Sequence, residues 1–203
     1  AEMIIVDAIT EISEKLIEKL PDLKLIHSEG VAFNRIDLAA AGKRGIYVCN
    51  CAGMNAKAVA EQTLLLMLGV VKNVVSGDAA VRDGNQMDVK MAYMGAGSLM
   101  ELADCKAGLI GFGAIGKATA RMLQGFGVEV YYTKRHRLTA EEEKEYQVRY
   151  LPMDELLKTC DMLSLHLPVT QETTGMCNRE FFGKCRKGSY FINTSRGELV
   201  DDD

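Results

Sequence analysis

The stretch at residues 107–116 reads AGLIGFGAIG and is the strongest indication of fold in this chain. Its first four residues predict a strand, and a helical pattern over residues 117–124 follows directly. A G-x-G-x-x-G triplet alone is a weak signal, but between a strand and a helix it is typical of a dinucleotide-binding βαβ unit. Gly111 permits the tight turn, Gly113 lets the backbone approach a pyrophosphate, and Gly116 lets the helix pack closely on the strand. The alternative is a glycine-rich turn in another doubly wound protein.

A pyrophosphate bound at this turn would lie at the N-terminus of the following helix, where free N–H groups and the helix dipole favour anions. The expected cofactor contacts at the turn are therefore Gly111, Gly113, Ala114, Ile115 and Gly116.

Short apolar strands alternate with helical patterns along the whole chain, which is typical of an α/β protein with a helix-covered parallel sheet. We expect a doubly wound, Rossmann-type sheet in residues 55–203 and a partial flavodoxin-like substrate domain in residues 1–54. Strands are expected at residues 3–6, 23–27, 46–49, 107–111, 128–133, 148–150, 162–166 and 189–192. Helices are expected at residues 12–20, 34–41, 55–82, 115–124, 153–159 and 178–184.

The long helix expected over residues 55–82 has a wide apolar face, which suggests a helix that spans domains or forms a dimer, and we expect a homodimer through it. The alternative is a helix buried in its own core. Its apolar run, Leu64–Val71, is shorter than the ~20 residues of a membrane helix, so no membrane partner is expected.

The composition is that of an ordinary globular protein, with 48% hydrophobic and 26% charged residues. Because the formal net charge is −4, we expect no nucleic-acid partner. The six cysteines show neither a Cys-x-x-Cys pair nor zinc-site spacing, so we expect no metal and free thiols in a reducing cytoplasm. They are Cys49, Cys51, Cys105, Cys160, Cys177 and Cys185.

The residues after the second strand of the expected Rossmann unit bear on which dinucleotide is bound. An NAD site usually has an acidic residue about 20 positions past the motif, where it binds the ribose 2′-hydroxyl. Here Thr133 stands at that place, and Lys134 and Arg135 begin a basic run that suits a 2′-phosphate. The sequence therefore favours NADP(H), with NAD(H) as second choice; the alternative for the run is a solvated surface turn.

A third motif, NTSRG at residues 193–197, follows the last expected strand. Ligands of open α/β sheets bind outside the carboxyl ends of strands, so Arg196 should face the same crevice as the glycine turn. Its planar guanidinium suits a carboxylate or a 2-oxo acid.

Three stretches together resemble the signatures of the D-isomer-specific 2-hydroxyacid dehydrogenase family, whose members include glyoxylate, hydroxypyruvate and phosphoglycerate enzymes. They are LIGFGAIG at residues 109–116, SLHLPVTQET at 164–173 and NTSRGELVD at 193–201. The resemblance covers essentially the whole chain. It implies an NAD(P)-dependent oxidoreductase that transfers a hydride to or from a small 2-hydroxy or 2-oxo acid.

By this resemblance Arg196 is the catalytic arginine that holds the substrate carboxylate and carbonyl. Backbone amides at Val31 and Ala32 would bind the substrate carboxylate, with Ala32 and Asn34 replacing the usual Gly and Asp. Residues 50–55 match the hinge between domains. Further cofactor contacts are implied at Leu167, Pro168, Thr173, Thr194 and Ser195.

The family's general acid is a histidine paired with a glutamate, both downstream of the arginine signature, and no matching residues occur in these 203 residues. Both ends of the chain look cut, so we expect a longer parent chain and no activity from this stretch alone. For His27, His136 and His166 we expect structural or cofactor-adjacent roles. The alternatives to a reductase are a dinucleotide-sensing co-repressor without turnover, and a formate or phosphite dehydrogenase on the same fold.

Overall fold

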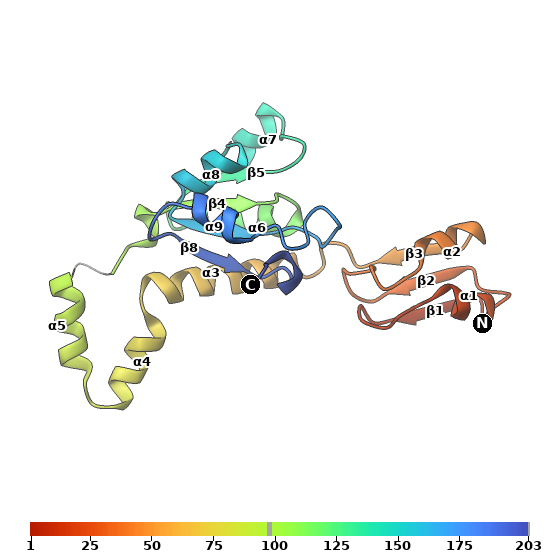
Figure 1. The fold of residues 1–203 in the computed structure, drawn as a ribbon, viewed down its shortest axis with the longest axis horizontal. Helices are drawn as coiled ribbons and strands as arrows, with labels where there is room; N and C mark the ends of the chain where they lie inside the picture. Colours follow the sequence, from red (N-terminus) through yellow and green to blue (C-terminus); the bar gives the residue numbers. More distant parts are fainter. Residues whose placement is uncertain (97–98, 203) are drawn as a thin grey trace. The chain divides into compact units, whose positions relative to one another are not determined.

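The structure is a computed structural model that describes residues 1–96 and 99–202. The chain divides into two compact units, Ala1–Asn55 and Ala56–Asp203. The boundary predicted from the sequence, between residues 54 and 55, lies one residue earlier. Both units consist of parallel strands and helices, as expected for an α/β protein (Figure 1).

The smaller unit contains one three-stranded parallel sheet, in the order β1-β2-β3. Two short helices pack on it around a core that includes Ile17, Ile26 and Ile46. Three parallel strands in chain order occur within a flavodoxin-like sheet but do not define one by themselves. The elements are β1 (Met3–Val6), α1 (Glu14–Glu18), β2 (Leu25–Ser28), α2 (Leu38–Lys43) and β3 (Tyr47–Asn50).

Both helices of this unit begin later than the sequence predicted. Ile12 forms a bridge with Ile36, its amide donating to the Arg35 carbonyl at 2.9 Å, so α1 cannot start until after Ser13. The side chain of Asp37 accepts a hydrogen bond from the Ala40 amide at 2.9 Å and thereby sets the start of α2.

The larger unit is built on a five-stranded parallel sheet in the order β6-β5-β4-β7-β8. The chain runs outward from β4 to β6, then crosses back to the other side of β4, so the order reverses between β4 and β7. This is the strand order of a Rossmann sheet. The strands are β4 (Lys106–Ile110), β5 (Glu129–Thr133), β6 (Val148–Tyr150), β7 (Met162–Leu165) and β8 (Tyr190–Asn193).

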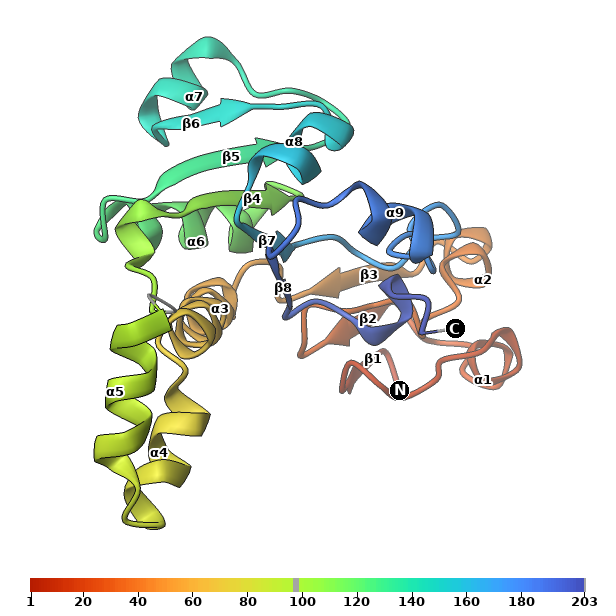
Figure 2. The same cartoon turned by 60° about the vertical axis from the view of Figure 1, so that its left-hand side comes forward.

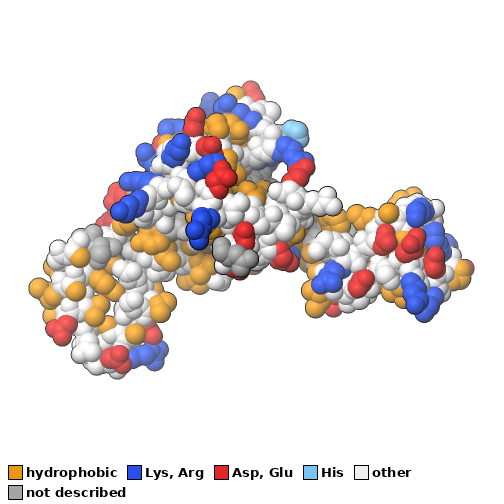
Figure 3. Space-filling view, viewed as in Figure 1, with side chains coloured by type: hydrophobic (Ala, Val, Ile, Leu, Met, Phe, Trp, Pro, Cys, Tyr) orange, Lys and Arg blue, Asp and Glu red, His pale blue; other side chains and the backbone are white. Residues whose placement is uncertain are grey.

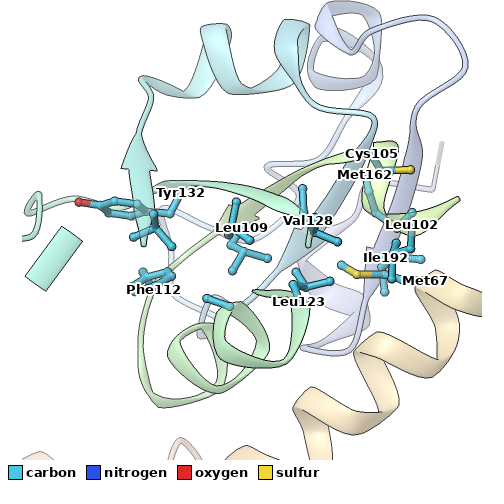
Figure 4. Packing of buried hydrophobic residues seen from close by; sticks show 14 of the residues in the cluster. Met67, Leu102, Cys105, Leu109, Phe112, Leu123, Val128, Tyr132, Met162 and Ile192 are labelled. Carbon is cyan, nitrogen blue, oxygen red and sulfur yellow. The ribbon is translucent and has the colours of Figure 1, made fainter. Parts of the chain in front are cut away.

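Helices cover both faces of this sheet. One face packs against α3 and α6 in a core that includes Met67, Leu109, Leu123 and Tyr132 (Figure 4). The other face packs against α8 and α9, chiefly through Leu156 and Phe181. The helices are α3 (Ala56–Val71), α4 (Val74–Arg82), α5 (Gln86–Ala96), α6 (Ala114–Gln124), α7 (Ala140–Glu145), α8 (Met153–Thr159) and α9 (Arg179–Lys184), with 3-10 turns at Leu102–Asp104 and Gly197–Leu199.

The prediction of one helix over residues 55–82 was wrong. Asn73 adopts a left-handed conformation with φ 51°, which ends α3, and α4 continues at a 63° bend. A further helix, α5, and the short α7 were not predicted. The helix α7 has a capping box, in which the side chains of Thr139 and Glu142 each bond the other residue's backbone amide.

Helices α4 and α5 lie side by side as a helical hairpin, the arm (residues 74–96), which extends away from the sheet of its own unit (Figure 2). Its side chains are largely exposed, and α5 has no buried residue. Among the described residues no single helix is long and apolar enough to cross a membrane, although α3 and α4 together reach that length and composition across their bend.

Candidate functional site

The glycine turn joins β4 to α6 at the carboxyl edge of the larger sheet, where the strand order reverses. Gly111 has φ 94°, and a Cβ placed on it would lie 2.8 Å from the carbonyl carbon of His166. A Cβ on Gly116 would lie 2.8 Å from the Gly111 carbonyl oxygen. A Cβ on Gly113, in contrast, would meet nothing within 4 Å. The first and third glycines are therefore required by packing, and the second leaves open space beside the backbone.

The N-terminus of α6 faces this open space. Gly113 is the residue before the helix and provides no side-chain cap, so the first amides of α6, including those of Ala114 and Ile115, have no acceptor within the helix. The combination of free amides and open space fits the phosphates of a dinucleotide.

The basic run after β5 is divided between two different environments. Thr133 is buried and ends the strand, Lys134 is half-buried, and exposed Arg135 forms an ion pair with exposed Glu172. Both partners of that pair are largely in solvent, so it is weak. Lys134 and Arg135 therefore remain accessible to a ligand at the end of β5.

Arg137, two residues further on, has a structural role. It donates to both carboxylate oxygens of Glu143, at 2.8 and 2.9 Å, and its guanidinium lies 5.2 Å from the ring centre of Tyr150. The hydroxyl of buried Tyr132 also donates to Glu143 at 2.8 Å. Arg137 lowers the pKa of Glu143, and burial raises the pKa of Tyr132 to about 12. These contacts fix the loop that presents Lys134 and Arg135.

The loop after β7 crosses next to the glycine turn. The amide of His166 donates to the Ile110 carbonyl at 2.7 Å, which continues the pairing of β7 with β4. Leu167 is half-buried and Pro168 is exposed. The hydroxyl of Thr173 donates to the Pro168 carbonyl at 2.8 Å and so closes the loop.

His166 is the most unusual group at this edge. Both of its ring nitrogens are buried and have no hydrogen-bond partner within the part of the chain that the structure describes. Burial lowers the pKa of His166 to about 4, so the imidazole is neutral at pH 7. A neutral histidine of this kind is a poor proton donor, consistent with the structural or cofactor-adjacent role expected from the sequence.

The segment after β8 is held by a network of hydrogen bonds. The Ser195 hydroxyl donates to the Leu165 carbonyl at 2.7 Å, and its amide donates to the Asn193 side chain at 2.9 Å. The hydroxyls of Thr194 and Thr63 lie 2.8 Å apart, which joins this segment to α3. Arg196 is exposed, and its guanidinium donates to the Ser195 carbonyl at 2.8 Å. The arginine thus stands on a rigid backbone with its side chain accessible.

In the smaller unit, Val31 and Ala32 lie in the loop after β2. The Ser28 hydroxyl donates to the Ala32 carbonyl at 2.8 Å, and the Asn50 side chain donates to the Val31 carbonyl at 2.6 Å. No hydrogen bond among the described residues uses the amides of Val31 and Ala32. The carbonyls of the loop are therefore fixed while these two amides are available.

The sequence missed two contacts at the larger unit's edge. Thr63, which contacts Thr194, lies 131 positions away in the chain and belongs to no motif. Glu172 lies within a recognised stretch, but nothing in its position indicated a pairing with Arg135. No group of three or more His, Cys, Asp or Glu residues within 1–96 and 99–202 could hold a metal ion.

The strand order and the glycine turn define the larger unit as a Rossmann-type dinucleotide-binding fold. Residues 64–203 match the family described as "D-isomer specific 2-hydroxyacid dehydrogenase, NAD binding domain". The chain belongs to this family.

Individual relatives agree with this assignment. The chain is 37% identical over 195 residues to a glyoxylate reductase of Thermococcus litoralis, with 94% of this chain and 58% of that protein covered. Among solved structures, a D-lactate dehydrogenase of Aquifex aeolicus complexed with NAD and lactic acid has a TM-score of 0.85 and 35% identity over 99% of this chain and 58% of that one. A Granulicella formate dehydrogenase has a TM-score of 0.87 and 29% identity over 99% and 53%. The chain therefore spans less than two thirds of the length of these proteins.

Proposed function

We propose that this chain is part of an NAD(P)-dependent D-2-hydroxyacid dehydrogenase, which transfers a hydride between the nicotinamide and a small 2-hydroxy or 2-oxo acid. The observation that carries the proposal is the placement of two groups at the carboxyl edge of one parallel sheet. The glycine turn follows β4 and Arg196 follows β8, with only β7 between these strands. A dinucleotide bound at the turn and an anion bound by Arg196 would share this edge.

The chemistry of hydride transfer gives Arg196 its role in this proposal. Reduction of a ketone builds negative charge on the carbonyl oxygen, and an exposed guanidinium on a fixed backbone can stabilise that charge. The free amides of Val31 and Ala32 would bind the substrate carboxylate. We also propose that the dinucleotide contacts Leu167, Pro168, Thr173, Thr194 and Ser195.

The test is an Arg196→Lys exchange in the complete natural chain, followed by NAD(P)H-dependent reduction of a panel of 2-oxo acids. We expect kcat/KM to fall by roughly 10²–10³, because lysine keeps the charge but loses the bidentate geometry. The dissociation constant of the dinucleotide, measured by fluorescence titration, should stay the same.

The same assay separates the other candidate activities. Dinucleotide binding without turnover of any 2-oxo acid would indicate a sensing protein instead. Reduction of NAD+ by formate or phosphite, with no reduction of 2-oxo acids, would indicate a dehydrogenase of those anions.

For the dinucleotide we propose a preference for NADP(H). Thr133 offers no carboxylate to a ribose 2′-hydroxyl, and the side chains of Lys134 and Arg135 are both within the loop that follows it. A 2′-phosphate can replace Glu172 as the partner of Arg135, because that ion pair is exposed.

Arg135→Asp is expected to weaken NADPH binding by roughly ten- to a hundredfold and to leave NADH binding nearly unchanged, since one charge-assisted hydrogen bond is worth about 1.5–3 kcal/mol. Dissociation constants of both cofactors provide the measurement. Arg82→Asp in α4 makes the same change in net charge away from the turn and serves as control. An unchanged ratio of the two constants in Arg135→Asp would exclude this role for the basic run.

We further propose a homodimer in which α3 and the arm contribute the interface. Exposed apolar side chains gather on these helices, and Figure 3 shows hydrophobic atoms over much of the arm. Exposed apolar side chains gathered in this way are typical of an association site. The exposed residues are Leu65, Leu66, Val74, Val75, Val81, Met87, Met91 and Met94.

The double exchange Val75→Glu and Met91→Glu should convert the dimer to a monomer, because each glutamate would place a charge within an apolar interface. Light scattering coupled to size-exclusion chromatography measures the mass directly. The double exchange Asn85→Glu and Gln86→Glu, at two exposed polar positions, adds the same two negative charges and serves as control. A wild-type protein that is monomeric at all accessible concentrations would rule the interface out.

We also propose a cytoplasmic location, without nucleic-acid or membrane partners.

A further inference from the structure

A thiol and an imidazole lie together at the carboxyl edge of the smaller sheet. Cys51 follows β3, and its sulfur is 3.7 Å from Nε2 of His27 near the end of β2. Both residues are half-buried, so neither is completely removed from solvent. A neutral imidazole in this position can accept the thiol proton as the sulfur reacts.

The other thiols differ from Cys51 in ways that predict low reactivity. Burial raises the pKa of Cys160 to about 12 and that of Cys177 to about 11. The pKa values of Cys105 and Cys185 are also raised by burial. Since the thiolate is the reactive form, these four thiols are poor nucleophiles at neutral pH.

Cys49 provides the informative comparison. It is more exposed than Cys51 and lies two residues earlier, within β3, opposite His27 in the pairing of β2 with β3. No hydrogen bond among the described residues involves its sulfur. Exposure alone would therefore make Cys49 the more reactive thiol, whereas pairing with an imidazole favours Cys51.

We propose that Cys51 is a site of oxidative modification by peroxides, with His27 as the base that accepts its proton. The Cys51 sulfur attacks one peroxide oxygen, an S–O bond forms and the O–O bond breaks. The sulfur is oxidised to a sulfenic acid and the peroxide is reduced. The departing hydroxide takes the proton from the His27 imidazolium and leaves as water.

The surroundings of Cys51 give this modification a local consequence. The Cys51 amide donates to the Gly30 carbonyl at 2.9 Å, and the neighbouring Asn50 side chain holds the Val31 carbonyl. An oxygen added to the sulfur therefore lies beside the loop that carries Val31 and Ala32. The reactivity itself does not depend on the function proposed above for that loop.

The experiment follows each cysteine of the purified chain by peptide mass spectrometry. Limited iodoacetamide at pH 7 should alkylate Cys51 at least about threefold faster than Cys49. After hydrogen peroxide, a dimedone-type trap should label Cys51. His27→Asn should reduce the Cys51 rate to that of Cys49 or below, and Cys49→Ser should leave Cys51 labelling intact.

Circular dichroism of each variant confirms that it is folded before rates are compared. Cys49 reacting as fast as Cys51, or a Cys51 rate that is the same in His27→Asn as in wild type, would overturn the proposal. The ratio of Cys51 to Cys49 alkylation in the wild-type chain needs no variant, so a wild-type ratio of one or less overturns the proposal even if His27→Asn does not fold.

Discussion

Replacement of Gly111 by alanine is expected to lower the free energy of unfolding of the larger unit by about 3 kcal/mol or more. Two costs combine at this position. An L-residue is strained at φ 94°, and the new Cβ would approach the backbone of His166, with its carbonyl carbon only 2.8 Å away. Because the obstacle is backbone at the end of β7, the clash is relieved only if β4 and β7 separate.

Urea denaturation followed by circular dichroism measures this loss, and Gly113→Ala is the matched control. Its backbone is extended, with φ −89° and ψ −157°, and the added Cβ meets nothing within 4 Å, so stability should change by less than about 1 kcal/mol. Under the proposed function the same methyl group fills the space of a pyrophosphate, and dinucleotide affinity should fall sharply. Equal losses of stability in the two variants would show that this division between a structural and a binding glycine is wrong.

The strands of the larger unit could be predicted because their signals are local. The central strands β4 and β7 are short apolar runs followed by Gly111 and His166, and β6 and α8 have the bounds that the sequence predicted. The glycine turn could be predicted as well, because each of its three glycines is expected there for a separate physical reason. The structure confirms the packing reasons at Gly111 and Gly116. Membership of the D-2-hydroxyacid dehydrogenase family followed from motifs of the same local kind.

The remaining features depend on contacts that no local pattern reveals. The break follows the apolar run Leu64–Val71, and the left-handed conformation of Asn73, with φ 51°, separates α3 from α4. The delayed start of α1 results from a bridge between Ile12 and Ile36, which are 24 positions apart. The basic run after β5 was predicted as one group. In the structure Arg137 is held by an ion pair with Glu143, whereas Lys134 and Arg135 remain accessible.

The stability of the larger unit is expected to fall as the pH is lowered from about 6.5 to about 4, and His166 is the reason. Its ordinary pKa is 6.5, and burial lowers it to about 4 in the folded chain. Between these values the unfolded chain binds a proton that the folded chain does not, so protonation favours unfolding. The contribution is absent above pH 6.5 and reaches about 3 kcal/mol at pH 4, at 1.36 kcal/mol for each pKa unit.

Urea denaturation at a series of pH values tests this expectation with His166→Asn, which removes the titrating group but keeps a polar side chain. The variant should lose most of the pH dependence between 4 and 6.5, whereas His136→Asn in the exposed basic loop should retain it. Carboxylates such as Glu143 add to the loss of stability only below pH 4.5, because their stabilisation is lost as the pH falls below their usual pKa of 4.5. A wild-type slope that persists in His166→Asn would show that other groups produce it, and that burial does not lower the pKa of His166 as inferred.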